Sequence, residues 1–164
     1  MTTTFNAATT KTVNVNGTNL VYREIGDKSG VPVVFLHHLT AVLEDWDPAI
    51  PDGLAKSHPV IVFDNRGVGG SEGKTPDTVA DMAKDAIAFI DALGLAKVDL
   101  FGFSLGVSMA ETNCAKWRRE SVPVGLREKG FEARCYFCFF STDLDFGGRI
   151  SFVWCFWILA MPVS

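Results

Sequence analysis

Three short, continuously apolar runs constrain the fold of this chain more than any other feature of its sequence. They are Val31–Leu36, Val60–Phe63 and Val98–Phe101, and a loop rich in polar residues or glycine follows each of them. Apolar runs without polar alternation are typical of strands that are buried on both faces, as in parallel sheets. Parallel strands need a crossover between them, usually a helix. The chain is therefore predicted to be an α/β protein with a mostly parallel sheet and helices on both faces.

The segments around these runs fit the same plan. Lys11–Val15 and Leu20–Glu24 are predicted to be two strands joined by an Asn-Gly pair, which is typical of a tight hairpin turn. Apolar residues recur at helical spacing from Val79 to Leu93 and predict a helix there. A shorter helix is predicted at about Pro48 to Ser57.

The motif Gly102-Phe-Ser104-Leu-Gly106 follows the third apolar run directly and has the form G-x-S-x-G. A serine at a sharp turn from a strand into a helix is held with its Oγ exposed. Glycines are needed on both sides because the backbones crowd there. The backbone N–H groups at the start of the helix would face the position where an oxyanion develops during acyl transfer.

Two more motifs end the preceding apolar runs. Phe35-Leu-His-His-Leu-Thr40 ends the first run, and Asp64-Asn-Arg-Gly-Val-Gly-Gly-Ser71 ends the second. With the serine motif they form one ordered set, in which residues 12–106 resemble the N-terminal half of an α/β-hydrolase. The resemblance is closest to the cofactor-free esterase, lactonase and haloperoxidase-like members of that family.

The resemblance implies catalytic roles for three residues. Ser104 would be the nucleophile, and the backbone N–H of Leu105 would be one oxyanion donor. The second donor would come from the loop after the first apolar run, where Leu39 is the matching position. The implied substrate is a small-molecule ester or lactone, and neither a cofactor nor a metal is expected.

The resemblance also implies structural roles around these residues. His37 and His38 stand where the family has a His-Gly pair and would shape the oxyanion loop, although they can also be interpreted as a metal site or as the catalytic base. Asp64, Arg66 and Gly67 match a loop that braces the site, although Asp64 can also be interpreted as the acid of a triad. The loop interpretation is preferred for both histidines, because a metal needs three or four ligands.

The family order of the triad is serine, acid, histidine. After Ser104 the sequence offers Asp143 and Asp145 as acids but contains no histidine. Without a general base a serine is a weak nucleophile. The chain is therefore expected to be close to inactive as a hydrolase, with hydrolysis of the ester or lactone bond expected of the full-length form. The alternative is a pseudoenzyme that binds a ligand in the same pocket. An epoxide hydrolase with an aspartate nucleophile is disfavoured because the motif carries serine.

The composition changes along the chain. All four cysteines lie after residue 110, and all three histidines lie before it. The expected organisation is a disordered segment 1–11, a partial α/β-hydrolase domain 12–106, truncated after the serine motif, and a tail 107–164 outside the family. Val107 and Ser108 can be encoded by the splice-donor sequence GTAAGT, so the tail is interpreted as intron read-through or a gene-model error.

Charge and hydropathy exclude several classes of partner. The net charge is −4 and no basic run occurs, which gives no reason to expect nucleic acid. The longest apolar run, Ile150–Val163, is shorter than the roughly 20 residues of a membrane span and contains a proline. With no secretory signal apparent, the expected location is the cytoplasm, and the sequence predicts no oligomeric state.

Overall fold

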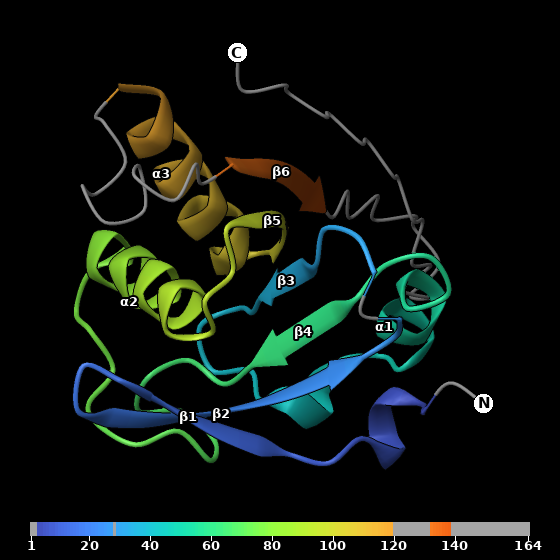
Figure 1. Ribbon diagram of the computed structural model, residues 1–164. Coiled ribbons are helices and arrows are strands. Elements are labelled where there is room, and N and C mark those ends of the chain that lie inside the picture. The colour runs from blue at the N-terminus through green and yellow to red at the C-terminus, as the bar shows by residue number, and fades with distance from the viewer. Residues whose placement is uncertain (1–2, 28, 120–131, 139–164) are drawn as a thin grey trace, which may run out of the picture.

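A six-stranded mixed sheet forms the centre of the computed structural model, which describes residues 3–27, 29–119 and 132–138 (Figure 1). The strand order is β1-β2-β4-β3-β5-β6. The strands are β1 (Lys11–Val15), β2 (Thr18–Ile25), β3 (Val33–Leu36), β4 (Val60–Phe63), β5 (Lys97–Phe103) and β6 (Glu132–Cys138). β1, β2 and β4 pair in antiparallel fashion, whereas β4, β3, β5 and β6 are parallel neighbours.

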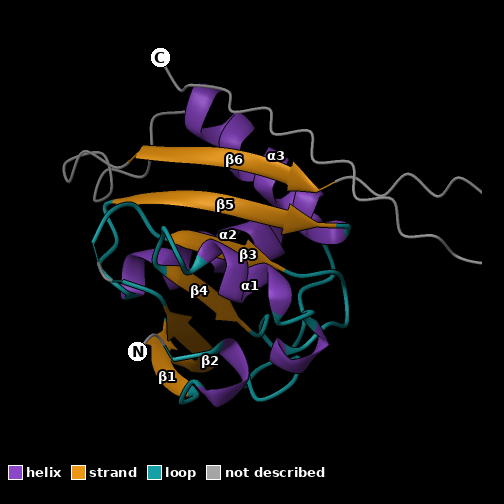
Figure 2. Cartoon of the chain, turned by 90° about the vertical axis from the view of Figure 1, so that its right-hand side faces the viewer, coloured by secondary structure: helices purple, strands orange, loops and turns teal. Residues whose placement is uncertain are grey.

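Helices cover both faces of this sheet (Figures 1 and 2). The helices α2 (Val79–Ala92) and α3 (Leu105–Arg119) lie on one face. The helix α1 (Ala49–Leu54) and the 3₁₀ turns η1 (Phe5–Ala7) and η2 (Leu43–Asp45) lie on the other. The prediction of an α/β fold with a mostly parallel sheet and helices on both faces is confirmed.

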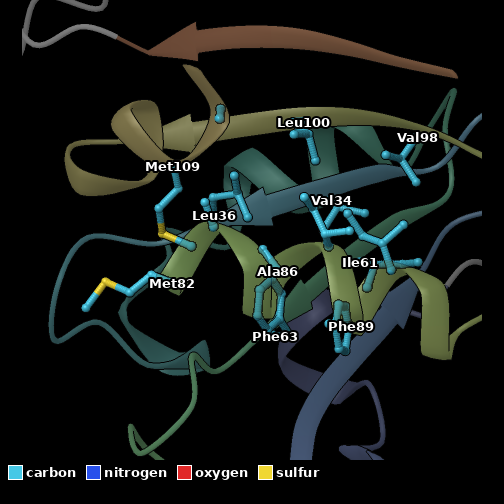
Figure 3. Close-up of a cluster of buried hydrophobic side chains, with 14 of the residues drawn as sticks. Val34, Leu36, Ile61, Phe63, Met82, Ala86, Phe89, Val98, Leu100 and Met109 are labelled. Carbon is cyan, nitrogen blue, oxygen red and sulfur yellow. The ribbon is translucent and has the colours of Figure 1, made fainter. Parts of the chain in front are cut away.

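The core on the α2–α3 face is aliphatic at its centre. Val34 and Leu36 of β3 point toward the helices, and Met82 of α2 and Met109 of α3 pack over them (Figure 3). The stacked rings of Phe63 and Phe89 fill the space between β4 and α2, with their centroids 4.2 Å apart. Because side chains alternate along a strand, every second residue of β3 and β4 serves this core.

The core on the other face is aromatic and lies next to the serine motif. Phe35 of β3 packs edge-on against Trp46, at 4.8 Å between ring centroids, and against Phe101 of β5 at 4.7 Å. Trp46 also contacts Phe103, the last residue of β5, at 6.0 Å. This group, Phe35, Trp46, Phe101 and Phe103, is called the aromatic cluster below.

The N-terminal segment differs from the predicted disorder of residues 1–11. From residue 3 onward it is described, and the side chain of Phe5 is fully buried in the core beside α1. The Phe5 N–H donates to Asp52 of α1 at 2.7 Å, and the guanidinium of Arg23 lies over its ring. A single phenylalanine in a polar, threonine-rich stretch forms no periodic pattern, so its burial could not be predicted from the sequence.

The chain beyond residue 106 continues the fold without a break at the expected boundary. α3 runs through residues 106 and 107, and β6 pairs with β5 over seven residue pairs, from Lys97–Glu132 to Phe103–Cys138. Residues 120–131 and 139–164, which include Asp143 and Asp145, lie outside the described residues. In the described part of the chain, no helix has the length and apolar character needed to cross a membrane.

Candidate active site

Ser104 occupies a strained turn between β5 and α3. Its φ is +54°, and it is one of two residues other than glycine in the described chain that have a positive φ. Such a backbone conformation costs of order 1–3 kcal/mol for an ordinary residue and persists only where the surroundings enforce it. The side chain of Ser104 is exposed. The turn therefore presents the Ser104 hydroxyl at the carboxyl end of the parallel strands.

The two glycines of the motif are required by close backbone contacts. A Cβ on Gly102 would lie 2.5 Å from the Gly106 carbonyl oxygen, and a Cβ on Gly106 would lie 1.9 Å from the Leu36 carbonyl oxygen. Neither contact can be relieved by turning a side chain, because both partners are backbone atoms. The first turn of α3 consequently rests directly on the end of β3.

The first backbone N–H groups of α3 follow Ser104 directly in the chain. The Val107 N–H donates to the Ser104 carbonyl at 2.9 Å, which closes the first turn. Leu105 is the first residue of the helix, so its N–H has no acceptor within the helix. This N–H lies at the positive end of the helix dipole.

The loop after β3 brings the residues predicted from the sequence beside the same turn. A Cβ on Gly106 would also approach the His37 carbonyl oxygen to 3.0 Å, so this loop contacts the start of α3. Residues 38–41 form a turn in which the Ala41 N–H donates to the His38 carbonyl at 3.2 Å. Leu39 lies at the tip of this turn, and 53% of the residue is exposed.

His37 is buried and held by a tryptophan. Its Nδ1 accepts a hydrogen bond of 2.6 Å from Nε1 of Trp46, and only 1% of the residue is exposed. Burial lowers the pKa of His37 to about 4, and the nearby carbonyl of Phe63 opposes this shift. The imidazole is therefore neutral at neutral pH, with its proton on Nε2. It acts here as a structural link between β3 and the aromatic cluster.

His38 has a different environment from its neighbour. It is half-buried, and its ring packs edge-on against Phe103 with 5.8 Å between the centroids. Phe103 immediately precedes Ser104, so the imidazole of His38 lies beside the serine turn. In the described residues, neither ring nitrogen of His38 forms a hydrogen bond.

Asp64 ties two loops together behind the site. It follows β4 and is buried, and its carboxylate accepts hydrogen bonds from the Leu43 N–H at 2.8 Å and the Gly70 N–H at 2.9 Å. Its carbonyl accepts the Ser71 hydroxyl at 2.8 Å. Burial raises the pKa of Asp64, and the two backbone N–H donors work in the opposite direction. The carboxylate is engaged with backbone on both oxygens, which is the arrangement of a brace.

Arg66 and Gly67 extend this brace to the rest of the fold. Arg66 Nε pairs with Asp85 of α2 at 2.8 Å, and its guanidinium donates to Thr18 of β2 at 2.6 Å. Gly67 has a φ of +72°, and a Cβ there would lie 2.5 Å from the Thr75 nitrogen. The loop 64–75 thus has little freedom to move.

The sheet, the serine turn and the two loops beside it are features of a known protein family. Residues 31–110 match the family model described as alpha/beta hydrolase fold. The N-terminal region of this chain belongs to the α/β-hydrolase family.

Individual relatives agree with this assignment. The α/β-hydrolase region is 37% identical over 94 residues to a non-heme chloroperoxidase of Streptomyces lividans, covering 56% of this chain and 33% of the relative. It is 31% identical over 115 residues to the human serine hydrolase BPHL, covering 68% of this chain and 40% of the relative. Among solved structures, an alpha/beta hydrolase fold protein from Chitinophaga pinensis has a TM-score of 0.62 at 47% identity, over 63% of this chain and 38% of that one. The chain spans between a third and two fifths of the length of these proteins.

Among the described residues, no hydrogen bond joins the Ser104 hydroxyl to a histidine or a carboxylate. The ring of His37 is engaged with Trp46, His38 packs on Phe103, and His58 precedes β4, at the opposite end of the strands from Ser104. In the same part of the chain, no group of three or more His, Cys, Asp or Glu could hold a metal ion.

Sequence reasoning missed two contacts of this site. The hydrogen bond between His37 and Trp46 joins residues nine positions apart, and the ring contact of His38 with Phe103 joins the loop after β3 to the end of β5. The only available signal was the recurrence of aromatic residues at the ends of the apolar runs.

Proposed function

We propose that the protein hydrolyses an ester or lactone-type acyl bond of a small molecule through Ser104, and that turnover by this chain is close to zero because no histidine follows Ser104 to act as general base. The observation that carries this proposal is the positive φ of Ser104 at a turn whose glycines have no room for a Cβ. Strain of this kind is found at functional sites, where it aims a reacting group. The name of the human relative, a serine hydrolase, supports the same chemistry.

In the proposed reaction, Ser104 Oγ attacks the acyl carbon while the hydroxyl proton passes to water, since no side chain of the described residues is hydrogen-bonded to Ser104 as a base. The oxyanion that forms would accept hydrogen bonds from the N–H groups of Leu105 and Leu39. Loss of one such donor typically costs 10²–10³ in rate. The leaving alcohol takes up a proton, and water then releases the acid from the acyl-enzyme.

Labelling with a fluorophosphonate tests this proposal, because such a probe forms a covalent bond with an activated serine. The expected result is one phosphonate on the wild-type protein, located at Ser104 by peptide mass spectrometry, and none on Ser104→Ala. Ser108→Ala is the matched control, because Ser108 is an exposed serine on the next turn of α3. Equal labelling of the wild type and Ser104→Ala would refute the proposal.

A second candidate is a non-catalytic protein that binds a ligand at this site. The observation in its favour is that all three histidines of the sequence precede Ser104. Ligand affinity that survives Ser104→Ala, together with no labelling of the wild-type protein, would support it.

A further inference from the structure

His38 places a hydrogen-bonding group beside the acyl group that Ser104 would carry. Its ring lies against Phe103, and the backbone of its loop touches the first turn of α3. The imidazole therefore borders the serine turn on the side of β3.

The nitrogens of His38 have no hydrogen-bond partner among the described residues and could meet a ligand. The ring is half-buried, it packs on an apolar neighbour through its edge or face, and its nitrogens form no hydrogen bond in the described residues. An acyl chain bound against Phe103 would displace water from these nitrogens. A polar group that loses water without gaining a partner costs free energy.

We propose that His38 is a specificity-determining residue that selects acyl groups with a hydrogen-bond acceptor next to the carbonyl, such as an α-alkoxy, α-keto or α-hydroxy oxygen. The imidazole N–H donates to that oxygen. A plain alkyl chain of the same length leaves the N–H without a partner, and a site built to bond a polar atom discriminates against an analogue that lacks it. This inference rests on the proposed function, because the acyl group is held on Ser104.

Two activated esters test the selection: p-nitrophenyl methoxyacetate and p-nitrophenyl butyrate, whose acyl chains differ by one oxygen in place of a methylene. Acylation of the full chain is followed by release of p-nitrophenol and by the mass of the acyl adduct. The measured quantity is the acylation rate with the methoxyacetate divided by the rate with the butyrate. This ratio is divided by the same ratio for hydrolysis of the two esters by hydroxide, which removes their difference in intrinsic reactivity. Because both rates come from one sample, the ratio does not depend on the fraction of folded protein.

The expected ratio is about tenfold higher for the wild type than for His38→Leu, because the free energy of one net hydrogen bond corresponds to about that factor in rate. His38→Gln keeps an N–H donor and is expected to retain part of the preference. His58→Leu, the same substitution at the opposite end of the strands, should leave the ratio unchanged.

The outcomes separate this inference from the proposed function. If the wild type forms no adduct, or if Ser104→Ala forms it equally fast, the proposed function fails and the selection fails with it. If Ser104 is acylated and His38→Leu has the wild-type ratio, the selection alone is overturned.

Discussion

At the scale of single residues, Gly106 shows how tightly the site is built. Substitution by alanine would place a Cβ 1.9 Å from the Leu36 carbonyl oxygen, so α3 would have to move away from β3. Overpacking against backbone is expected to lower the free energy of unfolding by about 3 kcal/mol. Thermal unfolding measures this change. Gly53→Ala is the control, since a Cβ on this α1 residue meets nothing within 4 Å, and its stability should stay level or rise.

The buried pair of His37 and Trp46 predicts a loss of stability in acid. Burial holds the pKa of His37 at about 4 in the folded protein, below the 6.5 of a free histidine side chain, so the unfolded chain binds more protons between these two values. Stability therefore falls as the pH drops through this window. Between pH 7 and pH 5 the contribution of His37 is about 2 kcal/mol.

Urea unfolding of the wild type and of His37→Gln at both pH values measures this contribution. The variant is expected to be less stable at pH 7, because a flexible amide does not fill the buried site of the imidazole ring, but it should lose about 2 kcal/mol less on acidification. Equal losses in both proteins would show that His37 is not responsible.

At the scale of elements, the N-terminal turn η1 is part of the core. Phe5 is fully buried beside α1, and removal of such a ring costs 3–5 kcal/mol. Phe5→Ala is expected to destabilise the protein by about that amount, measured by urea unfolding. Asn6→Ala, which changes the exposed neighbour in the same turn, should have an effect below about 0.5 kcal/mol. Similar small effects of both variants would contradict the packing of this segment.

The loop brace around Asp64 also acts between elements, because its carboxylate holds the N–H groups of Leu43 and Gly70. Asp64→Ala leaves both donors without their partner, and we expect a loss of about 2–4 kcal/mol. Asp47→Ala is the control, since among the described residues that carboxylate accepts one local N–H, from Ala49 two residues away. Hydrogen exchange of residues 42–45 and 68–71 should rise in Asp64→Ala and remain unchanged in Asp47→Ala.

At the scale of the whole molecule, β6 decides whether β5 is an inner strand or an edge. With β6 in place, β5 has parallel neighbours on both sides. A chain that ends at Arg119 is expected to show faster hydrogen exchange in residues 97–103, whereas residues 60–63 in β4 remain protected. Unchanged exchange in β5 would mean that β6 does not pair with it in solution.

The sequence predicted the central strands well because their residues face apolar layers on both sides. The apolar run Val60–Phe63 coincides with β4, and the periodic segment from Val79 coincides with α2 to within a residue. The burial of Phe5, and the contacts of Trp46 with Phe101 and Phe103, could not be predicted because these partners are distant in sequence. The register of β6 against β5 was equally out of reach, since strand partners after residue 110 follow no pattern that the chain displays.

The contact of Trp46 with both His37 and Phe103 gives the molecule a built-in optical signal. Indole emission responds to the polarity and hydrogen bonding of its surroundings, and this indole lies one ring away from the serine turn. With the other three tryptophans, Trp117, Trp154 and Trp157, replaced by phenylalanine, Trp46 would be the sole emitter. A molecule that binds beside Ser104 and shifts Phe103 would then change the wavelength or intensity of the Trp46 fluorescence. Ligand binding could therefore be followed without an attached dye.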